Sequence, residues 1–271
     1  MDQFGSYLRE LEKNLRRGVA TEHTHRPALK SFIESFDKGV TAFNEPKQVE
    51  CGAPDYIIFR KDIPVGHIEA KDVDKDLDAV EEDEQLIRYR DALPNLILTN
   101  YLEFRWFVDG ERRLTATLGS VGQDGVIRRN EKDGELVSNL LQDFLRAQAP
   151  TIGSPKDLAS RMAAKARLIH DIIRRAIETE AKSGLLNVTM EGLRRILISD
   201  LTREQFADIY AQTICYGLFA ARCNHKGTES FTRKTAGYDL PQTNPFLREF
   251  FGSLAGLDLD ARVVWAVDDL V

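Results

Sequence analysis

The sequence has few cysteines and no long apolar run, and both absences narrow the class of protein. Its 271 residues include only Cys51, Cys215 and Cys223, a sparse and odd set that fits a reducing compartment, so we expect a cytoplasmic location. Cys215, Cys223 and His225 do not have the spacing of a zinc site. There is no run of about 18 apolar residues and no signal-peptide pattern at the N-terminus. We therefore expect no membrane span and no membrane partner.

An excess of basic residues is also missing. The formal net charge is −6 at pH 7, whereas proteins that bind nucleic acid unaided usually carry a basic surface. Much of the acidity lies in one run, which we interpret as a solvated helix face and the loop before it: Asp72, Asp74, Asp76, Asp78, Glu81, Glu82, Asp83 and Glu84. If the chain acts on DNA, we expect another domain to contribute part of the DNA-binding affinity.

The most informative stretch that is present runs from Pro54 to Lys71. Two apolar runs in it predict a pair of strands, with Asp55 opening the first and Glu69 and Lys71 closing the second. Residues two apart on a strand point to the same face, so Glu69 and Lys71 share one. The two carboxylates, with a backbone carbonyl such as that of Ala70, offer the hard oxygen ligands that suit Mg²⁺. Lys71 is left to hold or deprotonate an attacking water and to neutralise charge on a phosphate.

Pro54-Asp55 followed by Glu69-x-Lys71, with thirteen residues between the two acids, resembles the signature of the PD-(D/E)xK nuclease superfamily. Gln85-x-x-x-Tyr89 resembles the motif of its RecB-like members, and the two side chains share a helix face. The resemblance implies that Gln85 helps to position the metal-site residues and that Tyr89 faces the DNA backbone. Several of these nucleases carry a glutamate on an N-terminal helix near the metal, and Glu22 is the candidate here.

Each of these residues also has an ordinary structural interpretation. A lone E-x-K on a strand is usually a solvated ion pair, and Gln85 and Tyr89 alone would be ordinary helix surface. Glu22 would be an acid favoured by the helix dipole. His23 and His25 are better interpreted as packing or polar surface than as metal ligands.

Residues 1–150 alternate between helical and strand patterns, which predicts an α/β nuclease domain with a mixed central sheet flanked by helices. We expect helices over 2–17, 21–37, 76–92 and 134–147, and strands over 47–51, 55–59, 64–71, 95–99, 101–108 and 114–118.

Residues 151–271 show no strand signal and predict an all-α domain. Ser154 and Pro155 open a helix expected to run to residue 183. Further helices are expected over 189–199, 202–223, 245–254 and 260–271, with Thr202 and Gln205 as a capping box and a loop over 224–244.

The segments 211–222 and 240–247, together with Thr21-Glu22-His23-Thr24, resemble the nuclease and helical coupler of type IIG and type ISP restriction–modification enzymes. In that family one polypeptide continues into an adenine methyltransferase and a target recognition domain. The resemblance implies double-stranded DNA as substrate, with dimerisation as a route to double-strand cleavage.

The sequence departs from that full pattern. It has no N-P-P-Y/F methyltransferase motif, since Asn244-Pro245-Phe246 is not one, and no P-loop for an ATPase. We therefore expect an N-terminal part of a longer protein or a stand-alone remnant, with any S-adenosylmethionine site in the missing downstream domain.

The leading hypothesis is a Mg²⁺-dependent DNA endonuclease domain joined to a helical coupler. A RecB-like repair exonuclease stays open, because the Gln85-x-x-x-Tyr89 motif does not separate the two. So does a nuclease fold kept as a DNA-binding or structural scaffold without turnover, against which the intact Asp55, Glu69 and Lys71 argue.

Overall fold

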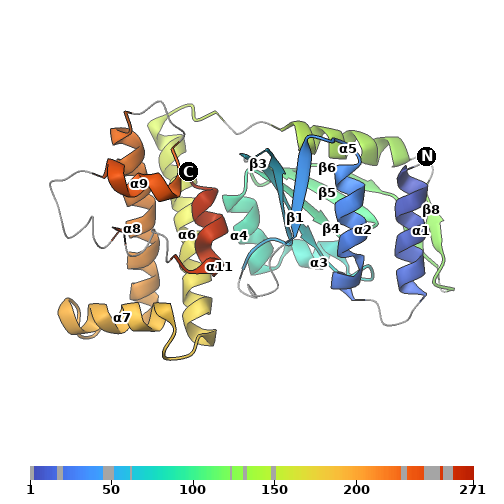
Figure 1. Ribbon diagram of the computed structural model, residues 1–271. Helices are drawn as coiled ribbons and strands as arrows, with labels where there is room; N and C mark the ends of the chain where they lie inside the picture. Colours follow the sequence, from blue (N-terminus) through green and yellow to red (C-terminus); the bar gives the residue numbers. More distant parts are fainter. Residues whose placement is uncertain are drawn as a thin grey trace. The chain divides into compact units, whose positions relative to one another are not determined.

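The chain forms two compact units. The computed structural model describes residues 3–16, 21–44, 52–61, 63–122, 124–130, 133–147, 151–226, 231–240, 251–252 and 259–271. One unit comprises Met1–Pro46 and Pro54–Thr151, and the other comprises Lys47–Ala53 and Ile152–Val271 (Figure 1).

The first unit is built on a mixed sheet of six strands in the order β1-β2-β3-β4-β5-β6 (Figure 1). The pair β3–β4 is parallel, and the other neighbours are antiparallel. The strands are β1 (Val40–Asn44), β2 (Tyr56–Arg60), β3 (Ile63–Ala70), β4 (Asn95–Thr99), β5 (Glu103–Val108) and β6 (Glu111–Thr117). A short ribbon, β7 (Gly119–Val121) with β8 (Ile127–Arg129), follows the sheet.

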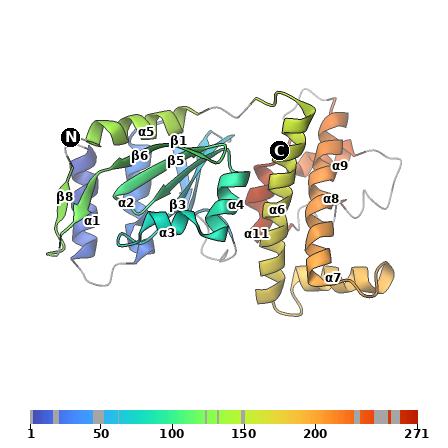
Figure 2. The same cartoon turned by 180° about the vertical axis from the view of Figure 1, so that it is seen from behind.

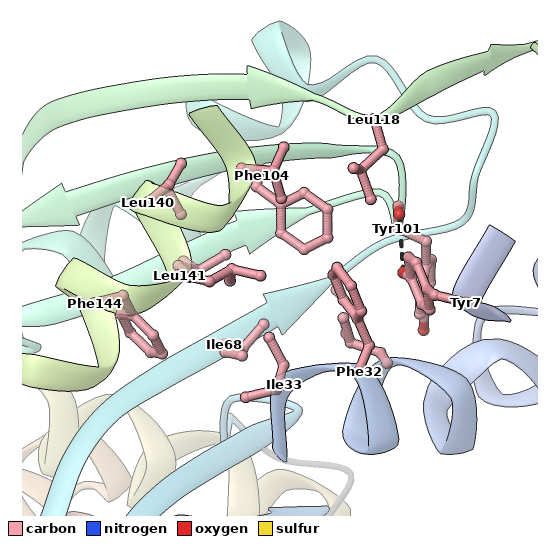
Figure 3. Packing of buried hydrophobic residues seen from close by; sticks show 14 of the residues in the cluster. Tyr7, Phe32, Ile33, Ile68, Tyr101, Phe104, Leu118, Leu140, Leu141 and Phe144 are labelled. Atoms are coloured by element: carbon pink, nitrogen blue, oxygen red, sulfur yellow. Dashed lines mark hydrogen bonds between the residues drawn. The ribbon is translucent and has the colours of Figure 1, made fainter. Parts of the chain in front are cut away.

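One face of this sheet packs on α1 (Gln3–Leu15), α2 (Glu22–Glu34) and α5 (Gly134–Arg146). Ile68, Ile97 and Phe104 point to this face from three neighbouring strands, as strand alternation requires. Figure 3 shows Ile68 and Phe104 in one core with Phe32 of α2 and Phe144 of α5, and Ile97 belongs to the same buried cluster. Burial of these large apolar side chains is the main contribution to the stability of the unit.

The opposite face carries α3 (Leu77–Glu81) and α4 (Glu84–Ala92). Arg105 of β5, 6% exposed, donates hydrogen bonds to Asp78 and Glu81 of α3 at 2.7 Å. The guanidinium of Arg90 on α4 lies 4.8 Å from the ring centroid of Phe107 on β5. These contacts fix both short helices against the face to which Glu69 belongs.

The expected single helix over 76–92 is wrong, because the acidic run forms two helices. Asp76 caps α3 by accepting a hydrogen bond from the Asp78 amide, and Asp83 occupies the N-cap position of α4. Aspartate favours N-caps over helix interiors, so an acid-rich segment can start two helices where periodicity suggests one.

The other expected elements of this unit that the structure describes lie close to their predicted places. The strand over 95–99 and the helix at 134–146 agree with the sequence interpretation. Strands β1, β7 and β8 were not expected, although β1 pairs with β2 along the whole of its length. The strand expected over 47–51 lies outside the described residues.

The second unit is helical throughout its described part (Figure 2). Its helices are α6 (Pro155–Thr179), α7 (Leu185–Ile196), α8 (Arg203–Asn224), α9 (Arg233–Asp239) and α11 (Ala261–Asp268). Helices α6 and α8 lie side by side and are in contact (Figure 2). Both carry buried apolar residues, among them Ile169 and Ile173 of α6 and Phe206 and Ile214 of α8. Helix α9 falls in the segment expected to be a loop, and most of the helix expected over 245–254 lies outside the described residues.

Candidate active site

The ends of β2 and β3 bring the candidate residues together. Tyr56 pairs with Ile68 in the antiparallel β2–β3 ladder, so Asp55, one residue earlier, lies opposite Glu69. Strand alternation places Glu69 and Lys71 on the face away from the main core, since Ile68 and Ala70 occupy the core side. Asp55 and Glu69 are both buried, at 6% and 4% exposure.

A hydrogen bond from the Ala70 amide to Oδ2 of Asp55, at 2.7 Å, fixes the first acid beside the second. Ala70 stands between Glu69 and Lys71, so this single contact joins the start of β2 to the end of β3. The N–H and C=O of one strand residue point to the same side of the strand. The carbonyl of Ala70 therefore lies on the side of β3 from which Asp55 approaches.

Lys71 completes the group through its side chain and its backbone. Its Nζ lies 2.6 Å from Oε1 of Glu69, and its amide donates to the carbonyl of Thr99 at 2.8 Å. The side chain of Lys71 is 27% exposed, against 5% for Glu69. Lys71 therefore connects a buried carboxylate to the surface, where a substrate would approach.

Arg26, near the start of α2, is a member of this site that the sequence interpretation missed. Its guanidinium forms an ion pair with Oδ1 of Asp55, and both side chains are almost fully buried. The hydroxyl of Tyr56 donates to the carbonyl of Arg26 at 2.7 Å, which ties α2 to the start of β2. The sequence held only an indirect indication of this partner. A buried Asp55 needs a nearby positive charge, and Lys71 is already next to Glu69, so a second cation was to be expected.

Glu22, the third expected carboxylate, lies in the first turn of α2, but its side chain is outside the described residues. Its role as a metal ligand stays a prediction.

Gln85 and Tyr89 form a pair on α4, as their spacing predicts. The amide of Gln85 donates to the hydroxyl of Tyr89 at 3.0 Å. Tyr89 is only 1% exposed, so the structure does not present it to the DNA backbone as the resemblance implies. A buried tyrosine hydroxyl needs a hydrogen-bond partner, and Gln85 supplies one.

A cleft of about 710 Å³ has His25 and Asp72 in its lining, whereas Arg26, Asp55, Glu69 and Lys71 are not among its lining residues. His25 is buried, and its ring centroid lies 5.2 Å from that of Tyr101. Burial lowers the pKa of His25 below its usual value of 6.5, and the negative charge of Asp72 offsets part of that effect. His25 therefore acts as a neutral packing residue near pH 7, as its sequence context indicated.

The donor set fits a hard divalent cation that keeps several waters. Within the described residues, no group of three or more His, Cys, Asp or Glu side chains is arranged to hold a metal. The available ligands are two carboxylates, from Asp55 and Glu69, and the carbonyl of Ala70. Mg²⁺ is commonly bound by one or two carboxylates with waters completing the octahedron, and this small set of oxygen atoms is of that kind.

Comparisons with known proteins add little to this geometry. No protein-family model and no curated protein matches the chain. Among the solved structures that match is a cryo-electron microscopy structure of a DrdV–DNA complex, at 17% sequence identity and a TM-score of 0.42. That match covers 54% of this chain and 98% of the other. Similarity at this level assigns no activity, so the functional argument depends on the site itself.

None of the described helices has the length and apolar character that a membrane-spanning helix needs.

Proposed function

We propose that this chain is a Mg²⁺-dependent DNA endonuclease that hydrolyses phosphodiester bonds at the ends of β2 and β3. The observation that carries the proposal is the hydrogen bond from the Ala70 amide to Asp55. This bond brings Asp55, at the start of β2, next to Glu69, the Ala70 carbonyl and Lys71 at the end of β3.

The residues of the site would divide the chemistry among them. Asp55, Glu69 and the Ala70 carbonyl would hold the ion, and Glu22 remains a further candidate ligand. A bound Mg²⁺ would supply charge neutralisation at the phosphate and activation of a water. Lys71, whose side chain is more exposed than that of Glu69, would orient the attacking water and contact a phosphate oxygen. Gln85, held by Tyr89, would support the arrangement from α4.

The helical second unit fits the role of a coupler better than a role in catalysis. Segment 211–222, which resembles the coupler of type IIG and type ISP restriction–modification enzymes, lies within α8 and contributes to the packing against α6. Segment 240–247 lies almost entirely outside the described residues. In this proposal, sequence choice and S-adenosylmethionine binding belong to methyltransferase and target-recognition domains of the same polypeptide, beyond this chain.

The direct test replaces Lys71 with alanine and measures Mg²⁺-dependent cleavage of double-stranded DNA. A residue that orients the attacking water contributes about 100-fold or more, so the rate should fall by at least that factor. Circular dichroism and DNA binding should be unchanged. Lys75→Ala is the matched control, because Lys75 is an exposed lysine in the loop that follows the site.

The same assay separates the two rival functions. Cleavage of closed circular DNA requires an endonuclease, whereas activity confined to linear DNA would favour a RecB-like exonuclease. If the parent chain binds DNA but does not cleave either form with Mg²⁺ or Mn²⁺, the fold serves as a binding scaffold. Normal cleavage by Lys71→Ala would show that the site is wrongly assigned.

A further inference from the structure

Arg26 is more firmly fixed than its sequence context suggests. Its guanidinium is paired with Asp55 and also donates to Oδ1 of Asn44 at 3.4 Å. Its own carbonyl accepts a hydrogen bond from the Tyr56 hydroxyl. Both ends of the residue are therefore tied to the strands that flank it, β1 and β2.

Arg26 and the Ala70 amide contact different oxygens of the Asp55 carboxylate. Oδ2 of Asp55 accepts from the Ala70 amide, and Oδ1 is the oxygen that faces Arg26. Glu69 is paired with Lys71 in the same way. The formal charges of these four side chains cancel, so a divalent cation entering the site would meet two positive side chains already in contact with its ligands.

A buried carboxylate cannot be left without a counter-charge, because desolvation of an isolated ion is very unfavourable. Arg26 supplies that counter-charge when no metal is bound, and its ion pair with Asp55 holds the carboxylate in place. A metal ion at Oδ1 would replace this function and would be repelled by the guanidinium at close range.

We infer that Arg26 is a positioning residue that competes with the divalent cation for Asp55: it holds the carboxylate in the metal-free chain and must yield Oδ1 when the ion binds. This inference rests on the proposed metal site but goes beyond it, because it assigns a regulatory role to a residue outside the nuclease motif. The fork of the guanidinium can turn toward Asn44 or toward a phosphate oxygen, so displacement from Asp55 does not leave it without an acceptor.

The test is a calorimetric titration of the DNA-free chain with Mn²⁺, in which the readout is affinity rather than activity. Arg26→Gln removes the positive charge and keeps a hydrogen-bond donor for Asp55. The removal of one cation beside the ligand should tighten Mn²⁺ binding by about tenfold. The same variant should have a lower melting temperature without metal and a larger increase in melting temperature on adding Mn²⁺ than the parent chain.

Two further variants control the experiment. Arg26→Lys keeps the charge, so its Mn²⁺ affinity should stay within about twofold of the parent chain. Arg60→Gln removes an arginine from the other end of β2, where it is paired with Asp37, and should leave the affinity unchanged. If Arg26→Gln does not fold, Arg26→Met makes the same test, because it removes the positive charge and keeps a long side chain in the buried position; unchanged Mn²⁺ affinity in Arg26→Met would overturn the competition.

The outcomes distinguish this inference from the proposed function. Unchanged or weaker Mn²⁺ binding by a folded Arg26→Gln chain overturns the competitive role of Arg26, while leaving the site intact. Mn²⁺ binding by the parent chain that persists in Asp55→Asn overturns both the metal site and the inference. Loss of binding in Asp55→Asn, with tightening in Arg26→Gln, supports both.

Discussion

At the scale of single residues, burial separates the acid–base pairs of this site from ordinary surface ion pairs. An exposed pair contributes at most about 1 kcal/mol, because water and salt screen it. Asp55 and Glu69 are largely withdrawn from water, so loss of either partner cation would leave a buried charge. The same Glu69-x-Lys71 sequence on an exposed strand would carry no functional implication. Its position at the buried end of β3 is what makes it a candidate for catalysis.

His25 gives a prediction about the pH dependence of stability. Burial lowers its pKa below 6.5, so the folded chain binds this proton less readily than the unfolded chain. The contribution of neutral His25 to the unfolding free energy is therefore complete above the pKa that His25 has in the unfolded chain. That contribution is lost as the pH falls from there toward the lower pKa of His25 in the folded chain. His25→Gln should reduce the loss of unfolding free energy between about pH 7 and about pH 5.

The measurement is urea unfolding at a series of pH values, with His23→Gln as the control, since His23 is an exposed residue on the same helix. An identical pH profile for His25→Gln and the parent chain would contradict the prediction.

At the scale of elements, the parallel pair β3–β4 holds the site and depends on a close approach of α5. A Cβ added to Gly66 in β3 would lie 2.5 Å from the ring of Phe144 and 2.8 Å from the side-chain nitrogen Nδ2 of Asn95. Phe144 is fully buried, so its ring cannot move aside without disturbing the core. Glycine at this position lets α5 lie directly on β3, the strand that carries Glu69.

Gly66→Ala should therefore destabilise the first unit by about 2 kcal/mol through overpacking. Denaturant unfolding monitored by intrinsic fluorescence would measure the change. Gly153→Ala is a suitable control, because a Cβ there would meet nothing within 4 Å. A Gly66→Ala chain as stable as the parent would show that the helix can shift without cost.

At the scale of the whole molecule, the residues of the candidate site belong to one compact unit. Arg26, Asp55, Glu69 and Lys71 belong to it, as do Gln85 and Tyr89. The second unit has its own core between α6 and α8. In the proposed function, the chemistry belongs to the first unit and the coupling role to the second.

Ile214 tests this division, because it is fully buried in the core of the second unit. Ile214→Ala should destabilise that unit by about 3 kcal/mol through loss of buried volume. Below its melting temperature, the variant should bind Mn²⁺ with the affinity of the parent chain. Ile196→Ala, at a highly exposed position on α7, should change neither property. A parallel loss of Mn²⁺ affinity in Ile214→Ala would mean that the helical unit shapes the site directly.

Local sequence determined much of this fold, because caps and apolar runs act over a few residues. Ser154 caps α6 by accepting a hydrogen bond from the Asp157 amide, and Thr202 and Gln205 form the expected capping box of α8. The buried run over 95–99 became β4 at the expected residues. The expected mixed sheet with flanking helices, followed by a helical region, agrees with the structure at this coarse level.

The sequence alone also singled out Asp55, Glu69 and Lys71, since residue type and spacing are enough to recognise a motif. Only the tertiary structure decided that Arg26 pairs with Asp55, that Tyr89 is buried, and that the Ala70 amide anchors the first acid. These contacts join residues distant in the chain, and local propensity carries no information about which distant partner a buried charge will meet. The acidic run shows the same limit, because Asp83 could act as a helix residue or a cap, and packing of α3 and α4 on the sheet selected the cap.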